Sequence, residues 1–278
     1  MKAPPDIRTR LVAAGQCADE DFPLAETALD LAAVDRPGVK LEPYRRHLGE
    51  IAAETAAYVS GKRAVDLGQR IEALVQVIAR RFGYSGTEDT FDDPDATNLT
   101  RVIDRRIGVP AALGVIYLTA LRTLGWPAVG IDFPGRFMIR LEHGGERAML
   151  DPFSGGDTVG PKELRDMLKG LSGKHAELSP ADYQEMTDRE VLMRLQGRVR
   201  SRLLRQDRME EAAEVIETML LFAPDTAHLW RECGFLHARL DNRRRAIAAL
   251  EEFLKRGGTG DSRYNAARLL QELRQRLN

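Results

Sequence analysis

The chain has 278 residues, of which 43% are hydrophobic and 30% charged, and its formal net charge at pH 7 is −1. This length allows one or two domains, and each would be large enough to bury a core of its own. The near-zero net charge excludes a global field that would drive binding to nucleic acid or to an anionic membrane, so partners must be inferred from local patches.

The two cysteines, Cys17 and Cys233, are distant in sequence and form no CxxC pattern. This arrangement indicates neither a disulfide framework nor a zinc site. The N-terminal region holds no apolar stretch long enough for a signal peptide, and no segment reaches the roughly 20 apolar residues of a membrane span. A cytoplasmic protein without membrane contact is therefore expected.

The first half of the chain shows helical periodicity in several segments. Helices are predicted over Pro23–Ala33, Tyr44–Val59, Ala64–Phe82, Asn98–Asp104 and Ala111–Gly125. Apolar residues cover nearly every side of the last of these, which Pro110 is placed to start. Such a pattern predicts a buried central helix.

Strand-like runs follow this central helix at Ala128–Asp132, Arg136–Glu142 and Arg147–Asp151. The sequence His143-Gly-Gly145 between the last two is typical of a hairpin turn. A central helix followed by an antiparallel meander predicts an α+β domain.

From Pro161 onward the chain is predicted to be entirely helical, with an internal repeat. Ala212 and Ala246 lie 34 residues apart in equivalent contexts, and Trp230-x-x-Cys233-Gly234 opens the second unit. That period and those positions are the tetratricopeptide (TPR) pattern. The predicted units are two repeats and a capping helix, namely Met193–Thr226, Ala227–Gly260 and Asp261–Leu277.

Several ordered motifs together resemble the SirB1 family of the transglutaminase-like superfamily. They are the segments Asn98–Pro110, Leu113–Tyr117, Gly125-Trp126, Phe133–Arg140 and Leu150–Gly156. The resemblance implies a transglutaminase-like (papain-like) α+β core, with a small antiparallel sheet on a central helix, followed by an all-α TPR-like region. The expected segments are a partly helical N-terminal extension over residues 1–40, the transglutaminase-like domain over 41–170, and the TPR-like repeats with their cap over 171–278.

The resemblance also implies where catalytic residues would stand. Enzymes of this superfamily use a Cys at the start of the central helix, then a His and an Asp on successive strands, so that the imidazole activates the thiol and the carboxylate orients the imidazole. Here Ala111 stands at the helix start, Arg136 replaces the His, and Asp151 alone matches. A guanidinium is not a general base near neutral pH, because its pKa stays above about 12. No catalytic residue is therefore assigned.

These degenerate positions define a candidate cleft of Arg136, Asp151, Trp126 and Asn98. One interpretation is a remodelled pocket in which Arg136 binds a carboxylate or a peptide terminus. The favoured interpretation is an ion pair that replaces the His–Asp hydrogen bond. A third role for Asp151 is to cap the turn into Pro152. No phosphate loop or metal-ligand spacing occurs, so neither cofactor nor metal is expected.

The sequence contains two arginine clusters. Arg105-Arg106 are placed to pair with the acidic loop Asp92–Asp95, with solvated surface charge as the alternative. Seven arginines between Arg189 and Arg208 could follow phosphates. Acidic neighbours and the lack of interleaved aromatic residues favour a solvated or inter-domain face instead.

The sequence thus favours a non-catalytic interaction or regulatory protein that binds a protein or peptide partner through its TPR-like region. Two alternatives stay open: a cysteine-independent amide hydrolase or acyltransferase with unrecognised catalytic residues, and a nucleic-acid-associated regulator. The partner, the pathway, the oligomeric state, a ligand of the degenerate cleft and the role of the N-terminal extension are not specified by the sequence.

Overall fold

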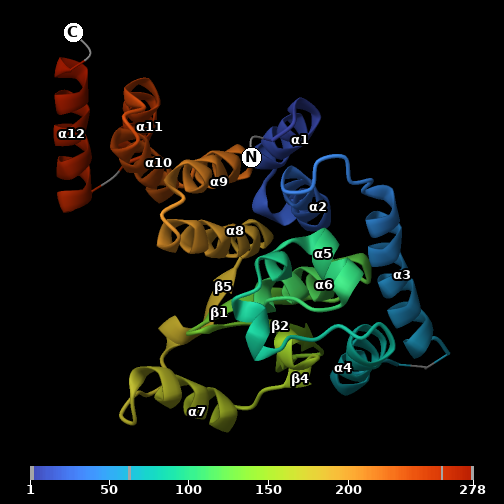
Figure 1. Ribbon diagram of the computed structural model, residues 1–278. Coiled ribbons are helices and arrows are strands. Elements are labelled where there is room, and N and C mark those ends of the chain that lie inside the picture. The colour runs from blue at the N-terminus through green and yellow to red at the C-terminus, as the bar shows by residue number, and fades with distance from the viewer. Residues whose placement is uncertain (1–2, 62–63, 258, 277–278) are drawn as a thin grey trace. The chain divides into compact units, whose positions relative to one another are not determined.

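The computed structural model describes residues 3–61, 64–257 and 259–276 (Figure 1). Two compact units make up the chain: Ala18–Leu195 is one, and Met1–Cys17 with Gln196–Asn278 is the other. The N-terminal extension is thereby divided between the two units, which the sequence did not indicate. The predicted segment boundaries at residues 40 and 170 stay predictions.

Helix α6 (Pro110–Thr123) forms the centre of the core unit. Pro110 occupies the first turn, where its missing N–H costs no hydrogen bond, and all but three of its fourteen residues are buried. Gly114 lets the helix approach the sheet closely, because a Cβ there would lie 2.1 Å from a ring carbon of Phe137. The predicted buried central helix is confirmed.

The sheet has five antiparallel strands in the order β4-β3-β2-β1-β5. The strands are β1 (Ala128–Phe133), β2 (Arg136–His143), β3 (Glu146–Asp151), β4 (Asp157–Thr158) and β5 (Gln184–Met186). The first three confirm the predicted meander. Strand β5 corrects the prediction that the chain is wholly helical after Pro161: its three residues carry no periodicity and are strand only because they pair with the edge of β1.

The β2–β3 hairpin turns through Gly144 and Gly145, since His143 pairs with Glu146 across them. Both glycines have positive φ, 60° and 84°. A two-residue turn with φ above zero at both positions matches the right-handed twist of the strands and favours glycine.

The other face of the sheet is covered by α7 (Pro161–Ser172). Leu164 and Leu168 of this helix pack with Ile131 and Met138, which pair across β1 and β2. Phe137, next to Met138, points to the opposite face and meets α6, as strand alternation requires. The core unit therefore has three layers: α7, the sheet and α6.

The helices that precede α6 follow the predicted order. They are α2 (Leu24–Val34), α3 (Glu42–Val59), α4 (Leu67–Leu74) with a π-helical continuation over Val75–Arg81, and α5 (Leu99–Arg105). The helix predicted from Ala64 begins later because Asp66 caps it, accepting a hydrogen bond from the backbone N–H of Gln69 in a capping box.

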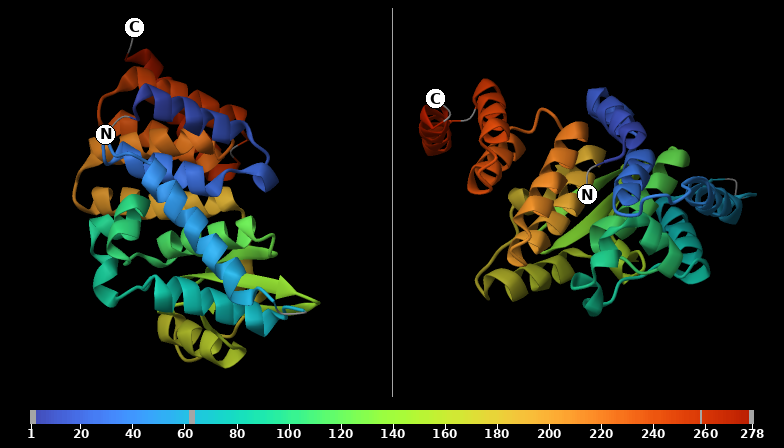
Figure 2. Two further views of the ribbon diagram at one scale, coloured as in Figure 1. Left: turned by 90° about the vertical axis from the view of Figure 1, so that its right-hand side faces the viewer. Right: turned by 45° about the horizontal axis from the view of Figure 1, so that its top comes forward.

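The helical unit confirms the repeat pattern (Figures 1 and 2). It comprises α9 (Met209–Phe222), α10 (Ala227–Arg239), α11 (Arg243–Lys255) and α12 (Gly260–Gln275), after α8 (Asp188–Arg205), which runs from one unit into the other. Successive helices from α9 to α12 contact one another. The predicted end of the cap at Leu277 lies outside the described residues.

Within the described ranges, no helix combines the length and apolarity needed to cross a bilayer.

An unpredicted helix, α1 (Pro5–Gln16), packs on α9 in this unit. Close approach depends on Gly15: a Cβ at that position would lie 2.3 Å from the carbonyl oxygen of Leu221. The backbone of α9 is rigid there, so the helices would have to separate.

We expect Gly15→Ala to lower the free energy of unfolding of the helical unit by about 1–3 kcal/mol, because it overpacks the α1–α9 contact. Gly197→Ala in α8 is the matched control, since a Cβ there meets no atom within 4 Å. Alanine should stabilise that helix by about 0.5–1 kcal/mol. Urea denaturation followed by circular dichroism measures both, and equal effects of the two substitutions would contradict the packing role of Gly15.

Candidate functional site

The three predicted triad positions all belong to the core unit, on α6, β2 and β3. Helix α6 packs on β2 and on the 3-10 turn Pro152–Ser154 that follows β3. Ala111 lies in the first turn of α6, three residues before Gly114, which contacts the Phe137 ring next to Arg136. Its side chain is a methyl group and is 6% exposed. The start of α6 therefore presents a methyl group and no nucleophile.

Arg136 and Asp151 form an ion pair, as predicted. The Nε of Arg136 lies 3.0 Å from Oδ2 of Asp151, and the carboxylate side chain is only 1% exposed. The Nε–H is not directed at that oxygen well enough to count as a hydrogen bond. The guanidinium also lies over the ring of Phe153, 5.2 Å from its centroid. Charge pairing and stacking thus occupy the position where an imidazole would stand.

Asp151 has a second, structural role. Its Oδ1 accepts a hydrogen bond from the backbone N–H of Phe153 at 2.9 Å, and its Oδ2 accepts one from the hydroxyl of Ser154 at 3.0 Å. These bonds cap the turn that begins at Pro152. The carboxylate is satisfied without a histidine, which accounts for an aspartate at this position in a chain that lacks the rest of the triad.

The other two residues of the predicted cleft make different contacts. Asn98 caps α5: its side-chain oxygen accepts from the backbone N–H of Arg101, while its amide donates to the carbonyl of Ala32 at 2.9 Å. Trp126 stacks with Arg70, 4.9 Å from the ring centroid. It precedes the start of β1, whereas Arg136 pairs with the end of β1. The structure therefore brings together Arg136 and Asp151 but places Trp126 at the opposite end of the hairpin.

Tyr117 is a buried polar residue of this region that the sequence did not single out. Its ring is fully buried in α6, and no residue in the described part of the chain hydrogen bonds its hydroxyl. A Cβ at Gly156 would lie 2.9 Å from that hydroxyl. Burial raises the pKa of Tyr117, and the carboxylates of Asp157 and Asp151 raise it further. The phenol stays protonated and supplies no base.

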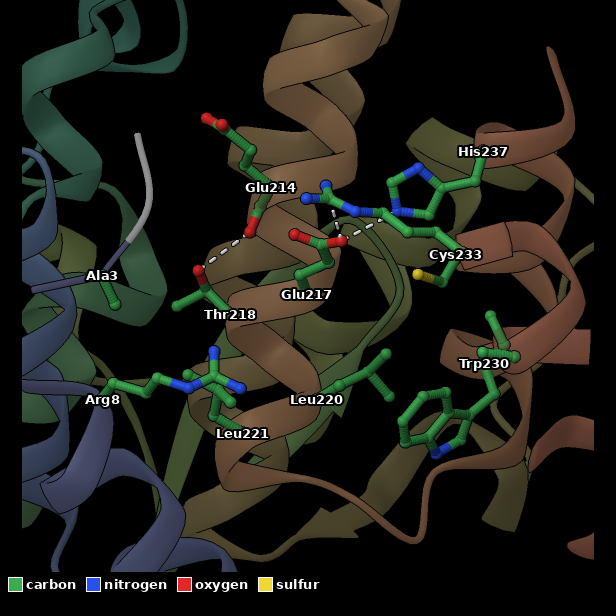
Figure 3. A pocket seen from close by; sticks show the side chains of 13 residues that line it. Ala3, Arg8, Glu214, Glu217, Thr218, Leu220, Leu221, Trp230, Cys233 and His237 are labelled. Atoms are coloured by element: carbon green, nitrogen blue, oxygen red, sulfur yellow. Dashed lines mark hydrogen bonds and ion pairs between the residues drawn. The ribbon is translucent and has the colours of Figure 1, made fainter. Parts of the chain in front are cut away.

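The helical unit has a first groove between α9, α10 and α11, with a volume of about 530 Å³ (Figure 3). Three of its polar side chains pair with one another: Nε2 of His237 lies 2.9 Å from Oε1 of Glu217, and Arg245 donates to the same oxygen at 3.4 Å. Cys233 also lines it, but burial raises the pKa of this thiol to about 12. A protonated thiol is a poor nucleophile, so the Cys–His–Glu grouping lacks an activated sulfur.

A second groove of about 780 Å³ lies between α10 and α12. Phe235 lines it and is 37% exposed, although it is a large aromatic residue. Arg231 and Arg239 line it too, and no carboxylate among the described residues pairs with either. The acidic side chains of this groove do have partners: Arg200 donates to Glu232 at 2.6 Å, and Arg268 lies 3.8 Å from Glu272. The exposed aromatic residue and the net positive charge distinguish this groove from the first.

The sequence did not identify Phe235 as a functional residue. The sequence shows that Phe235 follows Cys233 of the Trp-x-x-Cys-Gly motif by two residues. Its exposure, however, depends on how α12 packs beside α10. The available signal was an aromatic residue on the polar side of an amphipathic helix.

The arginines of the α8 region mostly engage carboxylates. Arg189 pairs with Asp19 at 2.8 Å, Arg194 contacts Asp132, and Arg200 pairs with Glu232. Of the two loop arginines, Arg105 pairs with Asp93 at 2.6 Å as predicted. Arg106 does not join it, because it turns toward His47 and Tyr84. The prediction for Arg106 was wrong.

The family comparisons agree with this geometry. The profile of the transglutaminase-like superfamily matches residues 42–197, and a tetratricopeptide repeat profile matches residues 199–278. The chain belongs to the SirB1 family of the transglutaminase-like superfamily. A UPF0162 protein of Vibrio cholerae is 31% identical over 241 residues, 85% of this chain and 88% of that protein. Protein SirB1 of Salmonella typhimurium is 29% identical over 188 residues, 67% of this chain and 70% of that protein.

This SirB1-family chain also has a buried polar cluster away from the triad positions. Nη1 of Arg106 donates to Nε2 of His47 and to the hydroxyl of Tyr84, which lies 2.9 Å from the same imidazole nitrogen. Arginine only donates, so Nε2 is unprotonated. Burial lowers the pKa of His47, and the neighbouring Arg106 charge lowers it further, while Glu50 acts in the opposite direction. Among the described residues, no group of His, Cys, Asp and Glu is arranged to hold a metal ion.

The Arg136–Asp151 pair leads to a stability prediction. Asp151→Ala should lower the free energy of unfolding by about 3 kcal/mol, because it removes the cap of the turn and leaves a half-buried guanidinium unpaired. Arg136→Met keeps the apolar contact with Phe153 but leaves the carboxylate of Asp151, which is 1% exposed, without its cation, so it should also cost about 3 kcal/mol. Urea denaturation of the two variants and of the double variant gives the coupling energy. A coupling near zero would contradict an energetic role for the ion pair.

The lowered pKa of His47 leads to a pH prediction. The unfolded chain binds a proton at this histidine near pH 6.5, whereas the folded chain binds it only at lower pH, so unfolding takes up a proton in that window. The free energy of unfolding should therefore fall as the pH drops below about 6.5, by at most about 1.4 kcal/mol per pH unit for this group. Urea denaturation at pH 7.5 and at pH 5.5 measures this decrease in the free energy of unfolding. The decrease should be smaller in His47→Gln than in the unaltered chain.

The pKa of His228 in the helical unit is also lowered by burial, with Arg200 and Arg231 adding to the effect. His228→Gln is therefore the control variant. In it, the core unit should still lose free energy of unfolding between pH 7.5 and 5.5. If the free energy of unfolding fell equally in His47→Gln and in the unaltered chain, His47 would not be the source of the pH dependence.

Proposed function

We propose that this protein is a non-catalytic interaction module that binds an acidic segment of another protein in the groove between α10 and α12. The observation that carries the proposal is the combination of exposed Phe235 with Arg231 and Arg239 on one groove wall. An aromatic residue supplies contact area at low entropic cost, and arginines supply charge-assisted hydrogen bonds. TPR repeats are an architecture that presents such surfaces to protein partners.

The occupant is inferred from charge complementarity. The carboxylates of this groove already have arginine partners, so the cations without a carboxylate dominate its field. An acidic segment with one apolar anchor matches them: its carboxylates would face Arg231 and Arg239, and its anchor would pack on Phe235. The first groove is less suited, because Glu217, His237 and Arg245 pair with each other inside it.

Loss of acyl-transfer chemistry supports the non-catalytic part of the proposal. Ala111 offers no nucleophile, Arg136 is no base, and the Cys233 thiol stays protonated near neutral pH. The core unit would then act as a rigid support. The alternative of a nucleic-acid-associated regulator gains no support from Arg189, Arg194 and Arg200, which are engaged by carboxylates.

Fluorescence anisotropy tests the proposed groove with a labelled peptide rich in Asp and Glu that carries one Leu. The intact chain should bind it, and Arg239→Glu or Phe235→Ala should weaken binding about tenfold or more. Affinity should fall with added salt. The same peptide with Gln in place of its acidic residues should bind more weakly.

Matched controls lie outside the groove. Tyr264→Ala removes another exposed aromatic residue, on α12 and 67% exposed, and Arg244→Glu reverses an exposed charge on α11. Neither should change the affinity. Equal weakening by Arg244→Glu and Arg239→Glu would show that general charge drives binding, and the proposed groove would then be wrong.

A further inference from the structure

A separate pocket of about 500 Å³ lies in the core unit, between the start of α3 and the end of α5. We call it the Arg106 pocket. The side chains that matter for it are Lys40, Pro43, Tyr44, Ile103, Asp104 and Arg106. It shares no residue with the degenerate triad positions or with the grooves of the helical unit.

Arg106 stands in an unfavourable backbone conformation. It is the C-cap of α5, with φ 62° and ψ 14°, in the left-handed region. That conformation costs free energy for any residue with a Cβ, and helices commonly place glycine at such a cap. Arg106 nevertheless occupies this position and lines the pocket, at the expense of local backbone strain.

The guanidinium is held rigidly, yet by neutral groups. Its Nη1 donates to His47 and Tyr84, and it lies over the Tyr84 ring, 4.9 Å from the centroid. The imidazole is neutral because Nε2 accepts this bond, and burial raises the pKa of Tyr84 to about 12. No carboxylate pairs with Arg106 in the part of the chain that the structure describes. Its positive charge is therefore positioned but not compensated.

The carboxylate in the pocket does not supply the missing charge. Asp104 accepts a hydrogen bond from Arg36 at 2.8 Å and from the Tyr44 hydroxyl at 3.0 Å. Arg36 and Asp104 neutralise one another, so Lys40 and Arg106 leave the pocket positive. Lys40 is exposed, and no described carboxylate pairs with it.

We propose that the Arg106 pocket binds a small organic oxyanion, a carboxylate or a phosphate monoester. The guanidinium of Arg106 offers a planar fork that fits either group, and Lys40 adds a mobile point charge. Pro43 and Ile103 give an apolar wall for the carbon part of the ligand. The fixed guanidinium loses little entropy on binding, because His47 and Tyr84 already hold it.

Titration of the intact ¹⁵N-labelled chain with benzoate and with phenyl phosphate, at constant ionic strength, tests this proposal by NMR. At least one anion should give saturable shifts of the backbone amides at Lys40, Tyr44 and Arg106, and benzamide should give none. The anion that binds more tightly identifies the class of ligand. Absence of saturable shifts from both anions would overturn the proposal.

Variants assign the binding to Arg106. Arg106→Gly suits the left-handed backbone and leaves the Tyr84 hydroxyl bonded to His47 at 2.9 Å, so the fold should persist while affinity falls about tenfold or more. Arg106→Lys keeps the charge without the fork and should give an intermediate loss, and Lys40→Gln should weaken binding several-fold. Arg105→Gln is the matched control, since that side chain pairs with Asp93. Unchanged affinity in both Arg106 variants would show that the anions bind elsewhere and would overturn the proposal.

Discussion

Burial of the apolar helix α6 against the sheet is the constraint on which the core unit depends. Its side chains are apolar on nearly all sides, so α6 must be enclosed by the sheet on one side and by the preceding helices on the others. Gly114 sets how closely it approaches Phe137. This contact fixes where the start of α6, the beginning of β2 and the end of β3 meet, whatever side chains stand there.

Within that frame, the triad positions have been filled by groups that satisfy one another. Ala111 contributes a methyl group, while Arg136 and Asp151 contribute opposite charges. Asp151 also caps the following turn, so its carboxylate has a structural role that needs no histidine. In the structure this pair of residues stabilises the turn that follows β3.

The proposed binding sites are defined by cations that lack a carboxylate partner among the described residues. The overall charge is −1, and several arginines of the α8 region pair with carboxylates. Arg231 and Arg239 border a groove beside an exposed aromatic residue, and Arg106 is held in a pocket by neutral groups. Uncompensated charge in a concave site is the feature that attracts an anionic partner.

The sequence by itself determined the elements whose cause is local. Apolar periodicity set α2 to α6, alternation and Gly144-Gly145 set the β2–β3 hairpin, and the 34-residue spacing set the repeats. The sequence also identified the predicted triad positions Ala111, Arg136 and Asp151, because the motifs around them are continuous in sequence. The Arg136–Asp151 pairing was expected from the family resemblance, which places the two residues where a His and an Asp would stand on successive strands.

Only the tertiary structure decided the features that depend on distant neighbours. Strand β5 exists because β1 offers an edge, and α1 joins the helical unit because Gly15 allows contact with α9. Arg106 looked equivalent to Arg105 in sequence, but its left-handed backbone turns it to His47 and Tyr84. Apolar periodicity indicates which side of a segment faces the core. Strand pairing, exposure and ion pairing depend instead on which distant residues the fold brings next to that segment.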